Sequence, residues 1–346
     1  MSEARLLLVG NPTAQSGRNA ARIERARGLL DAEGLHHDFL ATAPHGQTVG
    51  LVRDALVGAG DRYHTVVYMG GDGTFAEVAK GILAADAGRR VRLGMLPTGT
   101  ANDQGRSFGL SAEEPELPRN VHVIADGHES ALDAVKLRAL DEQDVLVRED
   151  WFFDSCGWGI SPRVLAMRNE DRETISKIPV VRDLWRDQLV YAGALFRTFL
   201  ASYVDDDKFD VEIETPDGEL RFLPGLTDLV VKNTRIYGGA WVLAPGSAPD
   251  DGLVEIVPFA GKRDWISKAI VALDASGQTE ETLGLVGVKH SDSIAVGKAR
   301  LRLRPRPGGV PLAAQIDGEE FPSSAHAEIE VAPRALRVII PGPPPA

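Results

Sequence analysis

The first 140 residues alternate short apolar runs with amphipathic segments. Residues 5–10, 65–69 and 91–96 are apolar runs of strand length, and a polar, glycine-containing stretch follows each of them. After the first two of these stretches, apolar residues recur at a spacing of three and four, which predicts helices. The repeated order of strand, loop and helix predicts an α/β domain with a parallel sheet, whose ligand-binding loops gather at one edge.

Beyond residue 140 the apolar positions alternate with a period of two, which is typical of strands that bury one face. This pattern predicts a mostly β second domain. Residues 161–203 instead have helical spacing and predict a helical insertion. We therefore place the domains at 1–140 and 141–332, and we expect a last strand, 333–341, to pack back on the first domain.

Composition and charge narrow the function classes. The chain has 346 residues, 43% of them hydrophobic and 25% charged, which is ordinary for a globular protein. A formal net charge of -12 argues against a general nucleic-acid binder. The single cysteine, Cys156, forms no internal disulfide and fits a reducing cytoplasm. No secretory signal is evident, and no apolar window approaches the roughly 18 residues of a spanning helix, so we expect a cytoplasmic protein with only peripheral membrane contact.

The stretch GGDGTFAEVAKGIL, residues 70–83, follows the second apolar run. Glycines let a backbone approach a ligand closely, and the start of the following helix favours an anion, as in phosphate-binding loops. A tight turn that needs positive φ explains the glycines equally well. It does not explain Asp72, because a carboxylate repels phosphate unless it binds a metal ion or accepts a proton.

Two further loops follow strands in the same way. PTGTANDQGR, residues 97–106, supplies small polar groups, and NPTAQSG, residues 11–17, adds Asn11, Ser16 and Gly17. Three such loops at one edge of a parallel sheet converge on the crevice where these sheets bind ligands. On local evidence, Asp103 and Arg106 fit an ion pair at a helix start as well as they fit a role in substrate binding.

These motifs, in this order and spacing, resemble the catalytic domain of the diacylglycerol kinase family of lipid kinases, which includes sphingosine and ceramide kinases and bacterial relatives. FFDSCGWGIS, DDGLVEI and IDGEEFP agree with the same family, so the resemblance covers almost the whole chain. It implies an NAD-kinase-like α/β nucleotide domain and a β-sandwich, with ATP and lipid meeting in a cleft. The GGDGT loop alone is shared with NAD kinases, whereas the PTGTAND loop favours the lipid kinases.

The resemblance also implies roles for individual residues. It implies two cofactors, ATP and Mg²⁺. The acidic residues matched to catalysis are Asp72, Asp317 and Glu319, and Asp251 matches a loop that holds a structural Mg²⁺. The residues matched to the nucleotide site are Asn11, Gly70, Gly71, Gly73, Thr74, Thr98, Gly99, Thr100 and Asn102.

Several local alternatives remain at this point. Asp72 and Asp317 both qualify as the general base, and we prefer Asp72 because it lies in the phosphate loop. Asp317-Gly318 and Asp251-Gly252 are also typical of ordinary turns. Arginines alternate at 300–306 and share one strand face, which suits either an anionic headgroup or, as we prefer, a solvated edge strand.

The predicted function is an ATP-dependent lipid kinase that phosphorylates a hydroxyl of diacylglycerol, ceramide or a sphingoid base. Its lipid partner would be met peripherally at a membrane surface. An NAD kinase and a non-catalytic nucleotide or lipid sensor are the alternatives. The motifs report neither the identity of the lipid nor the oligomeric state, for which a homodimer is one option.

Overall fold

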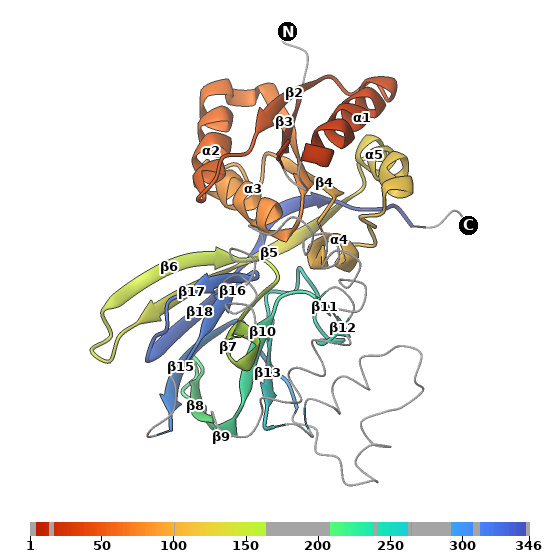
Figure 1. Ribbon diagram of the computed structural model, residues 1–346. Coiled ribbons are helices and arrows are strands. Elements are labelled where there is room, and N and C mark those ends of the chain that lie inside the picture. Colours follow the sequence, from red (N-terminus) through yellow and green to blue (C-terminus); the bar gives the residue numbers. More distant parts are fainter. Residues whose placement is uncertain are drawn as a thin grey trace. The chain divides into compact units, whose positions relative to one another are not determined.

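The computed structural model of the chain describes residues 5–13, 17–99, 101–163, 208–238, 241–261, 264, 292–306 and 312–343. The chain forms two compact units, which Figure 1 shows as ribbons and which are described separately below. Unit 1 comprises residues 1–134, 249–251 and 332–346, and unit 2 comprises 135–248 and 252–331. All but the first three residues of the predicted helical insertion lie outside the described residues.

The sheet of unit 1 is parallel, as the alternating pattern predicts. Its strands lie in the order β2-β1-β3-β4, and β4 pairs with the end of a long last strand, β18. The middle of this sheet is shielded from solvent. Leu8 of β1 and Val67 of β3 are neighbours in the strand register, and both are fully buried. The bounds are β1 (Arg5–Gly10), β2 (His37–Ala41), β3 (Tyr63–Gly70), β4 (Arg92–Pro97) and β18 (His326–Ile339).

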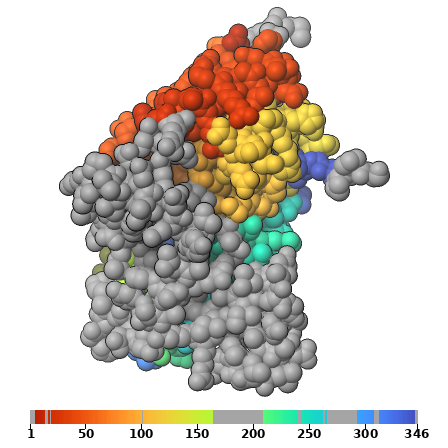
Figure 2. All heavy atoms as spheres, turned by 45° about the vertical axis from the view of Figure 1, so that its right-hand side comes forward, coloured from red at the N-terminus to blue at the C-terminus, as the bar shows by residue number. Residues whose placement is uncertain are grey.

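Helices cover both faces of this sheet. In Figure 1, α2 and α3 lie on one side of the strands and α1 and α5 on the other. Figure 2 shows the surfaces of α1, in orange-red, and α5, in yellow, next to each other, and His122 of α5 contacts Glu33 at the end of α1. No described helix is long and apolar enough to cross a membrane. The bounds are α1 (Arg18–Ala32), α2 (Gln47–Ala59), η2 (Gly60–Arg62), α3 (Asp72–Ala84), α4 (Asp103–Ser107), η3 (Glu114–Glu116) and α5 (Leu117–Asp126).

Unit 2 is a sandwich of two sheets. One sheet has the order β18-β15-β8-β9, with β5 joining β18 and β6 at the end, and the other has the order β14-β13-β10-β7-β16-β17. Apolar side chains from both sheets form one buried core, which includes Phe152, Trp158 and Phe209. The bounds are β5 (Glu129–Leu140), β6 (Leu146–Phe152), β7 (Ser155–Gly159), β8 (Phe209–Glu214), β9 (Leu220–Leu226), β10 (Asp228–Lys232), β11 (Ile236–Tyr237), β12 (Trp241–Val242), β13 (Val254–Phe259), β14 (Ile294–Val296), β15 (Lys298–Pro305), β16 (Ala314–Ile316) and β17 (Glu319–Phe321).

The division between the units differs in detail from a single boundary at residue 140. Strands β5 and β18 each contribute residues to both units, and the short segment 249–251 belongs to unit 1. That segment is held there because the Asp133 N–H donates to the Pro249 carbonyl at 2.7 Å. The Arg334 guanidinium also donates to the Asp250 carbonyl at 3.3 Å. Such contacts between distant segments leave no periodic signal in the sequence.

The alternating arginines lie on β15, and the edge-strand interpretation is wrong. Strand β15 is paired with β18 on one side and with β8 on the other. The arginine charges meet acidic partners on β8, since Arg302 bonds to Glu212 and Glu214 and Arg304 lies 3.7 Å from Glu212. The stripe is a cross-strand charge ladder, which weakens the case for an anionic headgroup contact.

Candidate active site

The junction of β3 and α3 is tighter than the glycine-rich sequence predicts. The strand ends at Gly70 and the helix begins at Asp72, so that only Gly71 lies between them. Gly71 has a φ of -97°, and the residues with positive φ do not include Gly70 or Gly73. A turn that requires positive φ is therefore not the reason for these glycines.

Close packing accounts for three of the glycines: Gly71 and Gly99 meet backbone to backbone, and Gly70 meets the Thr74 side chain. A Cβ atom on Gly99 would lie 2.6 Å from the Gly71 Cα, and one on Gly70 would lie 2.4 Å from Thr74 Oγ1. The Thr98 N–H donates to the Gly70 carbonyl at 2.7 Å, which joins the two strand ends. The turns after β3 and β4 thus form one compact surface at the start of α3. The N–H groups of a first helical turn have no partner within their own helix and favour an anion there.

Asn102 holds this arrangement from the side. Its side chain is buried, and it accepts the Gly99 N–H at 3.0 Å and donates to the Gly99 carbonyl at 2.5 Å. Asn102 itself has a φ of 52°, a conformation that asparagine tolerates better than most residues. Its side chain therefore serves the shape of the loop, while its predicted place in a nucleotide site remains a prediction. Thr100 lies outside the described residues.

The loop after β1 is organised around Asn11. The Asn11 side-chain oxygen accepts the Thr13 N–H at 2.9 Å and the Thr13 hydroxyl at 2.8 Å, and its carbonyl accepts the Asn19 amide at 2.6 Å. These bonds shape a turn that leads into α1. Ser16 lies outside the described residues.

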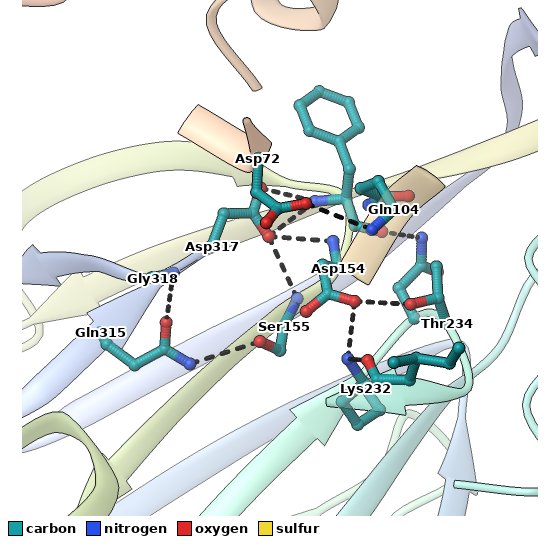
Figure 3. A network of polar contacts seen from close by, with 12 residues as sticks. Asp72, Gln104, Asp154, Ser155, Lys232, Thr234, Gln315, Asp317 and Gly318 are labelled. Atoms are coloured by element: carbon teal, nitrogen blue, oxygen red, sulfur yellow. Dashed lines mark hydrogen bonds and ion pairs between the residues drawn. The ribbon is translucent and has the colours of Figure 1, made fainter. Parts of the chain in front are cut away.

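Asp72 is the first residue of α3 and is half-buried. Its Oδ1 accepts the backbone N–H of Gln104 at 3.2 Å, so α4 orients the carboxylate (Figure 3). A negative charge at a helix start is stabilised by the helix dipole. Burial raises the pKa of Tyr68 well above its usual value, and the negative charge of Asp72 raises it further. The ring of Tyr68 packs edge-on against Phe75, with the ring centroids 5.3 Å apart.

In unit 2, Asp317 occupies the two-residue turn between β16 and β17. Asp317 and Gly318 have φ values of 46° and 81°, as the hairpin alternative requires. The Asp317 carboxylate accepts three backbone N–H groups, from Phe153 at 3.0 Å, Asp154 at 2.9 Å and Ser155 at 3.0 Å (Figure 3). These three bonds fix the turn against residues 153–155.

A buried cluster missed by the sequence reasoning supports this turn. The Lys232 side chain is fully buried, and its Nζ donates to Asp154 Oδ1 and to the Ile236 carbonyl, both at 2.6 Å. Thr234 bonds to the same Asp154 oxygen (Figure 3). A lysine directly after the apolar run LVV, residues 229–231, was the available signal, because a charged residue is buried in such a strand only with a partner.

The two remaining acidic residues of the predicted site are exposed. Glu319 begins β17, and Asp251 lies in the segment 249–251 that packs in unit 1. The neighbouring carboxylate of Asp250 lies 3.6 Å from the Arg334 guanidinium. Across the described ranges, no three His, Cys, Asp or Glu residues come together to hold a metal ion. The predicted role of Asp251 as a ligand of a structural Mg²⁺ stays a prediction.

The two units define a class of protein with a parallel α/β unit, a β-sandwich and an acidic residue at a glycine-lined helix start. Residues 5–137 match the model of the diacylglycerol kinase catalytic domain. A "Probable lipid kinase YegS-like" of Xanthomonas euvesicatoria pv. vesicatoria (strain 85-10) is 26% identical over 327 residues, which cover 92% of each chain.

Two solved structures share the fold. A diacylglycerol kinase from Bacillus anthracis str. Sterne has a TM-score of 0.65 and 18% identity, with 97% of each chain covered. A yeast NADH kinase complexed with NADH has a TM-score of 0.50 and 8% identity, covering 98% of this chain and 84% of its own. The match of residues 5–137 and the lipid kinase relatives confirm the resemblance to the diacylglycerol kinase family that the motifs predicted. The predicted fold class is confirmed as well.

Proposed function

We propose that the protein is an ATP-dependent kinase that transfers the γ-phosphoryl group of ATP to a hydroxyl of diacylglycerol or a related lipid, such as ceramide or a sphingoid base. The observation that carries this proposal is the position of Asp72. Asp72 is the first residue of α3 and directly follows Gly71, which packs against Gly99. Its carboxylate accepts the Gln104 N–H, which orients it. The similarity of residues 5–137 to the diacylglycerol kinase catalytic domain supports the same reaction.

The phosphates of ATP would bind at the start of α3. Gly70, Gly71, Gly73 and Thr74 would supply backbone and hydroxyl groups from one turn. Thr98 and Thr100 would supply hydroxyl groups from the other turn, and Gly99 would let the two turns approach each other. Backbone N–H groups at a helix start bind phosphate without a side-chain charge. Mg²⁺ would enter with the nucleotide, and it neutralises charge on the transferred group.

Asp72 would act as the general base. It accepts the proton of the acceptor hydroxyl while the hydroxyl oxygen attacks the γ-phosphorus. A new oxygen–phosphorus bond forms, the bond from the γ-phosphorus to the bridging oxygen breaks, and ADP leaves with that electron pair. We assign Asp317 a positioning role, because its carboxylate already accepts three backbone N–H groups. Glu319, on the same hairpin, would share this positioning role.

A lipid panel tests the reaction. The purified protein is incubated with labelled ATP, Mg²⁺ and vesicles that contain diacylglycerol, ceramide, a sphingoid base, phosphatidylglycerol or a polyprenol. We expect label in at least one lipid, transferred by protein that associates peripherally with the vesicles. If no lipid is labelled, the proposal fails. Labelled NAD in a parallel reaction would establish the NAD kinase alternative instead.

Replacing Asp72 tests the mechanism. Asp72→Asn keeps the size of the side chain but removes its ability to accept a proton, so turnover should fall by about 10²–10⁴-fold. The unfolding temperature and ATP binding should change little. Asp54→Asn, on the exposed side of α2, is the matched control and should leave turnover unchanged. Unchanged turnover in Asp72→Asn would remove Asp72 from the mechanism.

A further inference from the structure

Helix α4 buries polar side-chain atoms that have no hydrogen-bond partner. The Gln104 side chain is only 1% exposed, and among the described residues neither its Nε2 nor its Oε1 has a partner. Ser107 lies three residues further on, and its hydroxyl is also buried and unpartnered within the same described set. Residues three apart lie on one face of a helix. The two side chains therefore form one polar face, which we call the Gln104–Ser107 face.

Gln104 differs in this respect from the other buried amides. The side chains of Asn19, Asn120 and Asn233 each donate one hydrogen bond to a backbone carbonyl. The Asn102 amide uses both its oxygen and its nitrogen. Within the described part of the chain, Gln104 is the buried amide that makes no side-chain hydrogen bond at all.

An amide buried in this way is costly, since both its donor and its acceptor lose their bonds to water. A leucine or methionine of similar size would fill the same space without that cost. A glutamine here is therefore expected to meet a partner that arrives with a ligand. The backbone of the same residue indicates which ligand, because the Gln104 N–H holds Oδ1 of Asp72.

We infer that the Gln104–Ser107 face binds a hydrogen-bond donor group carried by the acceptor lipid next to the hydroxyl that is phosphorylated. The inference rests on the proposed kinase function. The Gln104–Ser107 face would favour acceptors with a free hydroxyl or an amide N–H beside the reacting hydroxyl. It disfavours diacylglycerol, whose neighbouring group is an ester.

The chemistry of the Gln104 side chain sets this preference. Its Oε1 can only accept a hydrogen bond, so it needs an O–H or N–H from the ligand. An ester carbonyl could satisfy Nε2, but it would leave Oε1 without a partner. A hydroxyl both donates and accepts, and it can serve Gln104 and Ser107 together.

The test compares two acceptors that differ in this one group. Both are short-chain glycerolipids: a diacylglycerol, and the monoacylglycerol that keeps a free hydroxyl beside the reacting one. Wild-type protein should have the higher kcat/KM with the monoacylglycerol. Gln104→Leu should lower that value about ten- to a hundredfold and lower the value for diacylglycerol much less, so that the ratio between the two acceptors falls. Ser107→Ala should act in the same direction with a smaller effect, and Gln143→Leu, on an exposed hairpin, is the control.

Stability measurements separate the outcomes. Without ligand, Gln104→Leu should unfold at the same or a higher temperature, since it removes an unpartnered buried amide. A lower unfolding temperature, with both acceptors slowed equally, would show a structural role and overturn the inference. A raised KM for ATP with an unchanged acceptor ratio would assign the face to the nucleotide and also overturn it.

A binding measurement keeps the inference testable if the kinase proposal fails. The monoacylglycerol alone, without ATP, should raise the unfolding temperature of the wild-type protein. Gln104→Leu should lose that increase. If no lipid is phosphorylated but this difference is found, the proposed reaction is wrong and the Gln104–Ser107 face still binds the lipid. If the increase is equal in both proteins, the inference fails.

Discussion

At the scale of single residues, two glycines shape the start of α3. Gly71 and Gly99 bring the turns after β3 and β4 together, with no room for a side chain between them. Asn102 then holds Gly99 through both of its amide atoms. The geometry at the start of α3 therefore requires residues without a Cβ atom at positions 71 and 99, in addition to the Asn102 side chain.

Gly99→Ala should separate these turns. The added Cβ would lie 2.6 Å from the Gly71 Cα, so the backbones must move apart. We expect a loss of roughly 1–3 kcal/mol in unfolding free energy from overpacking. Kinase turnover should fall by about tenfold to a hundredfold, because the phosphate groups would be misplaced. Denaturant unfolding and the lipid assay measure the two effects.

The matched control is Gly28→Ala, in the middle of α1, where an added Cβ meets nothing within 4 Å. Alanine suits a helix interior better than glycine, so this variant should gain about 0.5–1 kcal/mol. If both variants behaved alike, the backbone contact would not be what requires Gly99.

Asp228 makes stability depend on pH. It is fully buried, and burial raises its pKa from 3.8 to about 7, although Ser161 donates hydrogen bonds to it. The unfolded chain releases this proton near pH 4, whereas the folded protein retains it until about pH 7. Stability therefore declines as the pH rises from about 4 to about 7 and then levels off. The full effect is on the order of 4 kcal/mol.

Asp228→Asn should remove this decline. Relative to the wild type, the variant should gain unfolding free energy between pH 5 and pH 8, as measured by urea unfolding at both values. Asp54→Asn, a surface replacement, should differ from the wild type by the same amount at both pH values. A constant difference for Asp228→Asn would show that Asp228 is ionised in the folded protein throughout this range.

At the scale of elements, features that depend on local sequence pattern could be predicted, whereas contacts between distant segments could not. Strands β1, β3 and β4 and helices α1 and α3 follow from apolar spacing within each segment, and the Asp317-Gly318 turn follows from its dipeptide. Strand β2 and helices α2, α4 and α5 were not predicted. The partners of Asp317 are residues 153–155, more than 160 positions earlier in the chain. Spacing within a segment carries no information on such a pairing. The same reason hid the Lys232–Asp154 pair, which joins the end of β10 to the segment between β6 and β7.

Lys232→Met should strongly destabilise unit 2. It leaves Asp154 buried without its cation, which costs about 3–5 kcal/mol in buried pairs of this kind. Adding Asp154→Asn should restore part of that loss, because the uncompensated charge is removed. Lys298→Met, on the exposed face of β15, should change stability by at most about 1 kcal/mol. Denaturant unfolding of the four proteins completes the comparison, and equal losses at Lys232 and Lys298 would contradict it.

At the scale of the whole molecule, unit 1 is assembled from three separate stretches of the chain. Its sheet takes the end of β18, where Arg337 and Val338 pair with Arg92 and Leu93 of β4. Leu336, Val338 and Ile339 are at most 1% exposed. The region matched to the catalytic-domain model ends at residue 137, so it does not contain this strand.

A chain shortened after residue 331 should therefore fail to keep unit 1 folded. Burial of Leu336, Val338 and Ile339 contributes about 5–9 kcal/mol, which is comparable to the stability of a whole domain. A chain shortened after residue 343 keeps these residues and is the control. Thermal unfolding and ATP binding should be normal in the control and lost in the shorter chain. A stable, ATP-binding 1–331 chain would show that β4 needs no neighbour on that side.

The late position of this strand also sets an order of events during synthesis. The strands β1 to β4 leave the ribosome long before residues 332–346, yet the last place in their sheet is filled only by β18. Until then β4 presents an unpaired edge, the kind of surface at which nascent chains pair wrongly or bind a chaperone. Unit 1, although its first strands are made early, is thus among the last parts of the chain to be completed.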